Sequence, residues 1–321
     1  MKFSVIICTY NRSEILMDCL GSLLEMDDPG CPFEVLVIDN NSSDGTEERV
    51  KHFIRNNSSL DMRFIREEAQ GGVFARNRGI EEASGDLIFY LDDDQLIGRG
   101  CLAAYRHYYQ EAGYHCMGGK ILPWFRDEVT LPGWYDKSMQ GTLSLLDHGD
   151  QVKRVFYPEY PYEGNMIIAR FLYDTYGRFH EGLGRKGKNL MSNEGMDLLL
   201  RFESAGVPIH YVPDAEILHL VPPERLTRRF FIRRHYAQGM SDVYMFAKDR
   251  GAWWAIASLP RRLGELALSP LRFVTRFAFG RPGYFKSLLR IVYTIGYLDM
   301  TTRFLLKRCL DSGTSSVDGA V

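Results

Sequence analysis

Short apolar runs alternate with amphipathic runs along the first 95 residues of the chain. The first apolar run, SVIIC, has the length and continuity of a strand buried in a parallel sheet. The amphipathic runs place their apolar residues on one helical face. We predict strands at Ser4–Cys8, Glu34–Ile38, Arg63–Ile65 and Asp86–Leu91, and helices at Ser13–Leu24, Thr46–Ile54 and Val73–Ala83. This alternation predicts an α/β fold, a mostly parallel sheet with helices on both faces.

The pattern is less regular beyond residue 95. We expect loops at Gly118-Gly119, Pro123-Trp124 and Pro132-Gly133-Trp134, a strand at Met166–Ala169, a helix at Met196–Ala205, and short strands at Ile209–Val212 and Glu216–Leu218. Pro222-Pro223 then interrupts the chain and predicts a domain boundary. We therefore expect an α/β domain over residues 1–220, a mostly helical region over 221–310 and a disordered tail over 311–321.

Charge is distributed unevenly between these regions. Residues 221–310 hold 17 Lys and Arg against 5 Asp and Glu, a net +12, which leaves −14 for the rest of a chain whose overall charge is −2. An asymmetry of this size predicts a basic appendage that meets a polyanion. The alternative is that the Arg-rich helices simply have solvated faces.

The six cysteines are scattered and form no C-x-x-C pair, which is typical of a reducing compartment. No secretory signal and no apolar run of about 18 residues is recognisable. We expect a cytoplasmic protein without a membrane span.

Polar clusters follow three of the predicted strands, where ligands of such sheets bind. Asp92, Asp93 and Asp94 come directly after the fourth strand. Adjacent carboxylates repel one another, and a divalent cation is a suitable counter-charge because it prefers oxygen ligands and phosphates. The alternative is an acidic loop or helix cap. Asp39 ends the second strand, where it could accept hydrogen bonds from a nucleobase or ribose, within a sequence that also predicts a turn.

Three ordered motifs, SVIICTYNR, VIDNNSSDGT and GGVFARNRGIEEASGDLIFYLDDD, resemble family 2 glycosyltransferases of the GT-A fold, a Rossmann-like architecture. The resemblance covers roughly residues 3–220. It implies a nucleoside-diphosphate-sugar donor, with a UDP-sugar favoured, a Mn²⁺ or Mg²⁺ ion, and inversion at the anomeric carbon. By position, it implies that the nucleoside is held by Thr9, Tyr10, Asn11, Arg12 and Asp39. It also implies that Arg76 lies near the diphosphate, and that Asp92, Asp93 and Asp94 form the D-x-D element, with Asp92 and Asp94 at ribose and metal.

An inverting displacement needs a base that takes the proton of the acceptor hydroxyl. The family has an acidic cluster, E-D/E-x-D/E-L, at the start of a late helix, and the matching sequence here is Glu194-Gly195-Met196-Asp197-Leu198. Gly195 departs from the pattern, because the family usually has a second acid there. We expect Glu194 to be the base and Asp197 to be the second choice, although Asp197 could equally complement the helix dipole.

Other residues match the family less specifically. His219 follows a short predicted strand and could complete the metal site, although a lone histidine is often structural. Gly164-Asn165 resembles an element near the acceptor or, alternatively, a turn entering a strand. Trp124 and Trp134 could stack on sugars or simply fix their loops.

The segment Val221–Gly239 resembles a subset of bacterial family 2 enzymes of cell-surface polysaccharide assembly. Arginines and aromatic residues are interleaved there and farther on, as in helices that lie on an anionic membrane. The residues concerned are Arg228, Arg229, Phe230, Phe231, Arg233, Arg234, Trp253, Trp254, Arg261, Arg262, Phe273, Arg276, Phe277 and Phe279. Packing with snorkelling arginine side chains is the alternative.

We therefore expect a membrane-associated glycosyltransferase with a saccharide or lipid-linked acceptor, at the inner face of the cell membrane. A sugar-phosphate nucleotidyltransferase is a second hypothesis, although CTYNR lacks the glycines of a loop that holds a triphosphate. A non-catalytic binding protein of the same fold is a third. No recognised nucleic-acid-binding module is present, and we expect no nucleic-acid partner.

Overall fold

The computed structural model describes residues 1–184, 190–278 and 283–314. They separate into two compact units. Of the described residues, the α/β unit comprises Met1–Val129, 143–184 and Glu194–Pro222, and the helical unit comprises Thr130–Thr142, 190–193, 223–278 and 283–314.

One mixed sheet forms the centre of the α/β unit, and its first half is parallel. The strands of the described residues are β1 (Phe3–Thr9), β2 (Phe33–Asp39), β3 (Met62–Arg66), β4 (Leu87–Asp92), β5 (Gln95–Ile97), β6 (Cys116–Trp124), β7 (Lys153–Val155), β8 (Asn165–Ala169) and β9 (Ile209–Leu220). They are ordered β3-β2-β1-β4-β8-β6-β9-β5, with β7 also pairing with β9. The pairs among β1 to β4 are parallel, whereas β8 runs antiparallel to β4 and to β6. These four parallel strands coincide with the four apolar runs that the sequence predicts as strands.

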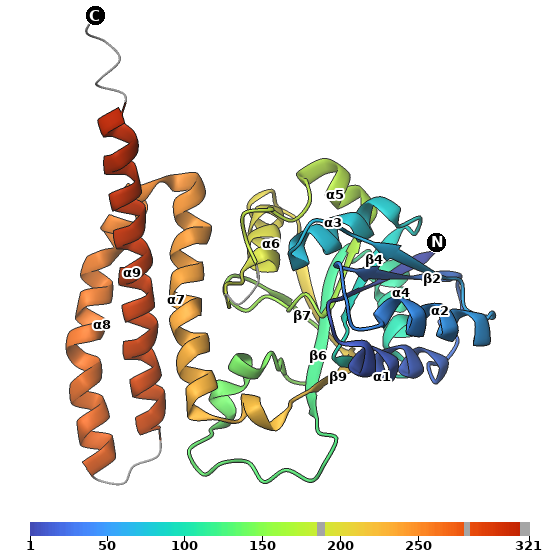
Figure 1. Ribbon diagram of the computed structural model, residues 1–321, viewed down its shortest axis with the longest axis horizontal. Coiled ribbons are helices and arrows are strands. Elements are labelled where there is room, and N and C mark those ends of the chain that lie inside the picture. The colour runs from blue at the N-terminus through green and yellow to red at the C-terminus, as the bar shows by residue number, and fades with distance from the viewer. Residues whose placement is uncertain (185–189, 279–282, 315–321) are drawn as a thin grey trace, which may run out of the picture. The chain divides into compact units, whose positions relative to one another are not determined.

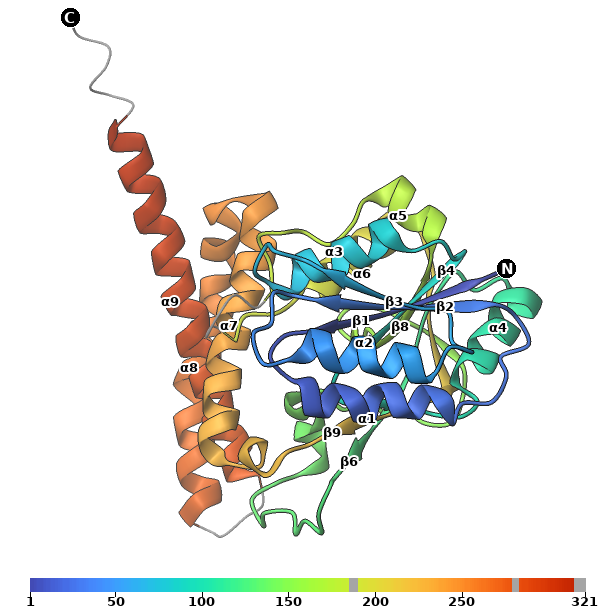
Figure 2. The ribbon, with the colours of Figure 1, turned by 45° about the vertical axis from the view of Figure 1, so that its right-hand side comes forward.

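Helices cover both faces of this sheet. They are α1 (Ser13–Leu24), α2 (Thr46–Asn56), α3 (Gly72–Glu82), α4 (Cys101–Ala112), α5 (Arg170–Tyr176) and α6 (Glu194–Ser204). Figure 2 shows α1 and α2 on one side of the parallel strands and α3 on the other. The first three helices lie where the sequence predicts them, and α6 begins two residues earlier than expected. The α/β fold with helices on both faces is confirmed.

Two predictions about the second half of the sheet are wrong. Gly118-Gly119 and Pro123-Trp124 are not loops but parts of β6, and the two short strands predicted near residues 209–218 are one strand, β9. A Cβ on Gly119 would lie 1.7 Å from the carbonyl oxygen of Ala215, so glycine serves close strand approach here rather than a turn. The β6–β9 register shifts between Gly119 and Lys120, so a bulge keeps β9 continuous.

The helical unit is formed mainly by α7 (Arg228–Arg250), α8 (Ala252–Ala278) and α9 (Tyr284–Thr314), with the short helices η1 (Lys137–Leu143) and η2 (Pro223–Arg225) also present in the chain. Figure 1 shows α9 running beside α7 and α8. Val243, Ala247, Tyr297 and Met300 form a buried cluster between α7 and α9. The mostly helical character expected for this region is confirmed.

Glycines allow α7 and α9 to approach closely. A Cβ on Gly239 would lie 2.1 Å from the carbonyl oxygen of Tyr293, and one on Gly296 would lie 2.1 Å from that of Tyr236. The two backbones therefore touch, with no side chain between them at this crossing.

The last helix continues past the predicted start of the tail, to Thr314, while residues 315–321 lie outside the described part of the chain. Helix ends are poorly defined by periodicity, which explains the difference. Phe279 also lies outside the described residues. None of the helices in the described ranges is both long enough and apolar enough to cross a membrane.

Candidate active site

The carboxyl ends of β1, β2 and β4 lie side by side at one edge of the sheet. Thr9 pairs with Asp39 across β1 and β2, and Cys8 pairs with Asp92 across β1 and β4. Three polar clusters that are far apart in the sequence therefore meet at this edge, as the strand order requires.

The middle residue of the acidic triplet points into the protein. Asp93 is 4% exposed and accepts hydrogen bonds from Thr9 Oγ1 at 2.8 Å and from Arg12 Nη1 at 2.9 Å. Burial raises the pKa of Asp93 to about 6, against the opposing effect of Arg12. The same Arg12 nitrogen lies 3.3 Å from Asp94 Oδ2. Thr9 and Arg12, which the sequence predicts to hold a nucleoside, therefore contact the acidic triplet in this structure.

Asp94 and His219 are brought together by the pairing of β5 with β9. Gln95 stands opposite His219 in this antiparallel pair, and His219 Nε2 lies 3.4 Å from Asp94 Oδ1. Asp92 is the most open acid of the triplet, with 39% of its side chain exposed. Within the described residues no three His, Cys, Asp or Glu side chains form a ready-made metal cluster.

This donor set suits a cation that shares its coordination with substrate. Mg²⁺ and similar ions are commonly bound by one or two carboxylates together with phosphate oxygens and water. Asp94 and the imidazole of His219 offer such donors, with Asp92 two positions earlier in the chain. The chemistry of these residues therefore fits a divalent ion completed by a diphosphate.

Arg76, on the second turn of α3, lies between acids from two other elements. Its Nη2 lies 3.6 Å from Asp92 Oδ1 and its Nη1 lies 3.0 Å from Glu194 Oε1. Burial acts to lower the pKa of this guanidinium, but Glu194, Asp92 and Glu163 outweigh burial and raise it above its usual value. A permanent positive charge therefore stands beside the acidic triplet.

The first turn of α6 carries the two acids predicted as bases. Glu194 is 7% exposed and binds Arg76, while its Oε2 is buried and accepts no hydrogen bond from the described residues. Asp197 is 4% exposed, and its Oδ2 lies 3.3 Å from Arg201 Nε, four residues along the same helix. The helix thus brings Glu194, but not Asp197, into contact with Arg76.

Glu163, which sequence reasoning missed, joins this group. It precedes β8, and its Oε1 accepts a hydrogen bond of 2.6 Å from the backbone N–H of Gly195. Burial raises the pKa of Glu163, and the charge of Glu194 raises it further. The sequence signal that could have drawn attention to Glu163 is its position directly before the Gly164-Asn165 element.

The Gly164-Asn165 element is closely packed at the start of β8, and a role near the acceptor stays a prediction. A Cβ on Gly164 would lie 2.6 Å from Asp92 Oδ2, so only glycine lets this loop run against the acidic triplet. Asn165 is fully buried, and it binds Tyr105 Oη and the carbonyl oxygen of Ala215, each at 2.8 Å.

The end of β2 forms the turn that its sequence predicts. Asp39 has no exposed surface and accepts from the backbone N–H of Ser42 at 3.1 Å. Asn11, with φ of 51°, accepts from the backbone N–H of Ser43 at 2.8 Å, which ties the β1 loop to this turn. Tyr10 is 46% exposed beside them. Nucleoside contacts of these residues stay predictions.

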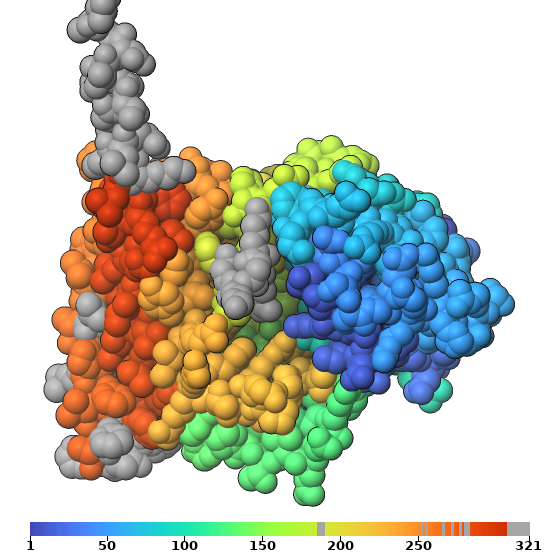
Figure 3. Space-filling model, viewed as in Figure 1, coloured from blue at the N-terminus to red at the C-terminus, as the bar shows by residue number. Residues whose placement is uncertain are grey.

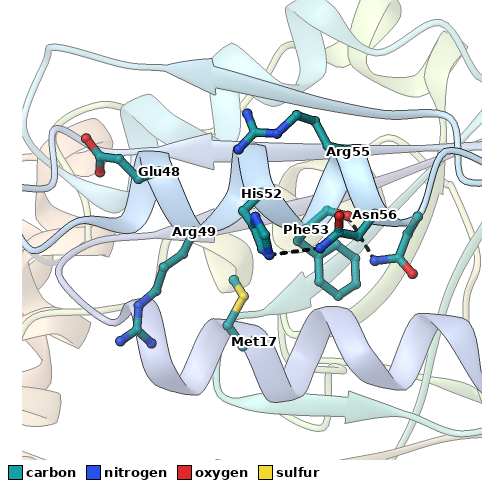
Figure 4. Close-up of a pocket in the computed structure, with 8 residues that line it drawn as sticks. Met17, Glu48, Arg49, His52, Phe53, Arg55 and Asn56 are labelled. Atoms are coloured by element: carbon teal, nitrogen blue, oxygen red, sulfur yellow. Dashed lines mark hydrogen bonds between the residues drawn. The ribbon is translucent and has the colours of Figure 1, made fainter.

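Two other features do not join the group. Trp134 packs edge-on against Phe231 and Phe285 within the helical unit, with ring centroids 5.1 and 4.8 Å away, which accords with fixing a loop. A depression between α1 and α2, lined by Met17 and by α2 residues such as His52, contains none of the predicted site residues (Figure 4). The blue N-terminal segment that carries these two helices lies at the surface in Figure 3.

Residues 4–159 match the family model described as glycosyl transferase family 2. The matched part is just under half of the chain and includes the acidic triplet and Arg76.

Several curated proteins are similar to parts of the chain. The glycosyltransferase AglE of Haloferax volcanii is 42% identical over 91 residues, 28% of this chain and 30% of that protein. The poly(ribitol-phosphate) β-N-acetylglucosaminyltransferase TarS of Staphylococcus aureus is 34% identical over 102 residues, 32% of this chain and 18% of that protein. The succinoglycan biosynthesis protein ExoM of Rhizobium meliloti is 24% identical over 77% of each chain. The chain therefore spans less than a third of the first two relatives.

Solved structures share the fold. A mannosyltransferase of Pyrobaculum calidifontis, in complex with GDP-Man and Mn²⁺, superposes with a TM-score of 0.62 at 16% identity, over 94% of this chain and 86% of that one. GalNAc-T7, with UDP, GalNAc and Mn²⁺, gives 0.54 at 18% identity, over 78% and 50%. The expected GT-A fold is confirmed.

Proposed function

We propose that this protein is an inverting, metal-dependent glycosyltransferase. It moves a sugar from a nucleoside-diphosphate-sugar to a hydroxyl of a saccharide or lipid-linked acceptor in cell-surface polysaccharide synthesis. The observation that carries the proposal is the meeting of Asp92, the Asp94–His219 pair and Arg76 at one sheet edge. Names of relatives, including a β-1,3-glucosyltransferase that acts on an undecaprenol-linked glycan, support the acceptor class.

Asp94 and His219, together with Asp92, would hold Mn²⁺ or Mg²⁺. When bound, the ion neutralises negative charge that develops on the departing diphosphate. Arg76 places a second positive charge beside the same acids, so it stabilises the leaving group without needing to move. Arg12 keeps Asp93 and Asp94 in place from the other side.

The donor nucleoside is proposed to lie against Thr9–Arg12 and the Asp39 turn. Tyr10, at 46% exposure, offers a face on which a base can stack. A UDP-sugar is our favoured donor. The catalytic residues are proposed to lie within residues 1–220. From the sequence, Glu194 and then Asp197, both in the first turn of α6, are the candidates for the base, and Glu163 contacts the same turn from the loop before β8.

The functional test uses the purified full chain, Mn²⁺ and a panel of UDP-, GDP- and dTDP-sugars. We expect one donor class to bind only with Mn²⁺ and to be slowly hydrolysed. Asp94→Ala should abolish metal-dependent binding, whereas Asp27→Asn, a surface carboxylate with 64% of its side chain exposed, should not. Thermal unfolding without ligand checks that each variant folds. Binding of no donor by the wild type would reject the proposal, and pyrophosphate release from a nucleoside triphosphate and a sugar phosphate would favour a nucleotidyltransferase.

We also propose that the basic helical region, 221–310, contacts an anionic membrane surface at the cytoplasmic face. Arg228, Arg229 and Arg233 are exposed at the start of α7. Large apolar side chains are exposed on α8, where Trp253 is 71% and Val274 is 57% accessible. Exposed arginines and apolar residues in one helical region are the composition expected of such a surface.

A further inference from the structure

Glu163 reaches the start of α6 from a different part of the chain. It lies 32 residues before Gly195, whose backbone N–H donates to Glu163 Oε1 at 2.6 Å. This N–H belongs to the first turn of the helix, where it has no partner within the helix, and where the helix dipole favours negative charge. The hydrogen bond therefore fixes the carboxylate at the head of α6.

Two glycines make room for this arrangement. A Cβ on Gly195 would lie 2.4 Å from Glu163 Oε1 and 2.5 Å from its Cδ, so Glu163 occupies the space that any side chain at position 195 would need. A Cβ on Gly164 would meet Asp92 Oδ2 at 2.6 Å. The loop that carries Glu163 thus packs against both the acidic triplet and α6.

The acids of α6 are engaged elsewhere. Glu194 is bound to Arg76 at 3.0 Å, and Asp197 lies against Arg201. Among the described residues, Glu163 forms no ion pair within 4.0 Å, and the residue as a whole is partly buried. The Oε2 atom of Glu194 is buried beside this group and accepts no hydrogen bond from the described residues.

We infer that Glu163, rather than an acid of α6, is the general base of the transfer, with Glu194 positioning Arg76. This inference rests on the glycosyltransferase function proposed above. As the acceptor oxygen bonds to the anomeric carbon, the bond from that carbon to the diphosphate breaks and its electron pair leaves with the diphosphate. The acceptor's proton passes to the Glu163 oxygen that does not bind Gly195. The raised pKa of Glu163 is in the direction that suits a base acting near neutral pH.

The test uses water as the acceptor and measures release of nucleoside diphosphate from the donor that binds best with Mn²⁺. Glu163→Gln keeps an oxygen for the N–H of Gly195 but cannot take a proton. We expect the rate of release to fall about 10²–10⁴-fold, the usual effect of removing a general base. Donor binding and thermal unfolding should stay unchanged. Glu159→Gln, an exposed acid of the same loop, is the matched control and should keep the wild-type rate.

Azide separates a base from a merely structural acid, because it attacks the anomeric carbon without losing a proton. High azide should restore nucleotide release in Glu163→Gln, with a glycosyl azide as the product, and should leave a misfolded site inactive. A second variant, Glu163→Gly combined with Gly195→Glu, returns a carboxylate to the same space from the helix and should be at least about tenfold faster than Glu163→Gly alone.

A Glu163→Gln enzyme that hydrolyses the donor within threefold of wild type would overturn the inference, as would a loss of activity that azide does not restore. Failure of the proposed function shows differently, because the wild type itself would then bind and hydrolyse no donor.

Discussion

The three adjacent aspartates after β4 do not share one environment. Asp93 is buried and held by Thr9 and Arg12, whereas Asp92 remains open and Asp94 faces His219. Part of the repulsion within the triplet is therefore relieved by Arg12 itself. We therefore propose the first and third acids as ligands of the ion, whereas the middle one is held by its two protein partners.

Glu34 provides a measurable pH dependence of stability. Burial alone would raise its pKa, but hydrogen bonds from Ser4 and Ser84 and the charge of Lys2 outweigh burial and lower the pKa to about 2, from 4.5. A lowered pKa stabilises the folded state above the unfolded pKa, and this stability is lost as pH falls from about 4.5 to about 2. We expect Glu34→Gln to lower the free energy of unfolding at pH 7 by about 3 kcal/mol.

The measurement is urea unfolding of both proteins at several pH values. The difference between them should be constant above pH 5 and should shrink as pH falls through that window. A difference that does not change with pH would mean that the ionised form of Glu34 contributes nothing.

The sequence alone identifies site residues that lie in a recognisable motif. It does not identify residues that come together only through the tertiary fold. Strand ends place Asp39, Asp92 and Thr9 together because parallel strands finish at one edge. The contact of Glu163 with Gly195 has no such pattern, since it depends on where a loop before β8 meets a helix.

The packing of α3 on the sheet depends on one glycine. A Cβ on Gly79 would lie 2.6 Å from Cγ2 of Ile6, a fully buried residue of β1. Gly79 lies inside the helix, where alanine would ordinarily stabilise by about 1 kcal/mol. We expect the sign to reverse, with Gly79→Ala lowering the free energy of unfolding by about 1–3 kcal/mol through overpacking.

Gly21, inside α1, is the matched control, because a Cβ there would meet nothing within 4 Å. Gly21→Ala should raise the midpoint of urea unfolding while Gly79→Ala lowers it. Equal effects of the two substitutions would contradict the close approach of α3 to β1.

Elements with clean periodicity could be predicted to within a residue or two, as α1 and β2 show. Elements whose residue types are set by tertiary packing, rather than by a regular apolar pattern, could not be predicted from the sequence. In β6 the glycines and the proline are residue types that usually indicate a loop. Here the glycines allow neighbouring backbone to approach the strand closely, and the proline lies near its end. Helix α4 buries only Cys101, Leu102 and Tyr105, which is too few to give a helical pattern.

At the scale of the whole chain, the basic helical region predicts a salt-dependent association with vesicles. The full chain should co-sediment with vesicles that contain phosphatidylglycerol and not with phosphatidylcholine alone. Each arginine near the surface is worth about 1 kcal/mol, so Arg229→Gln with Arg233→Gln should weaken binding about 30-fold.

Lys51→Gln with Arg55→Gln, on α2 of the other unit, removes the same charge from exposed positions and should have little effect. Equal losses in the two double variants would indicate that net charge alone matters, and would argue against a membrane surface on α7.

The direct backbone contact between α7 and α9 limits which substitutions the chain can tolerate at this interface. Where apolar side chains fill a helix interface, one apolar residue can be replaced by another of similar volume. At Gly239 and Gly296 no such exchange exists, because even one added methyl group would occupy the place of a carbonyl oxygen. The alignment of these two helices therefore depends on two positions at which only glycine fits.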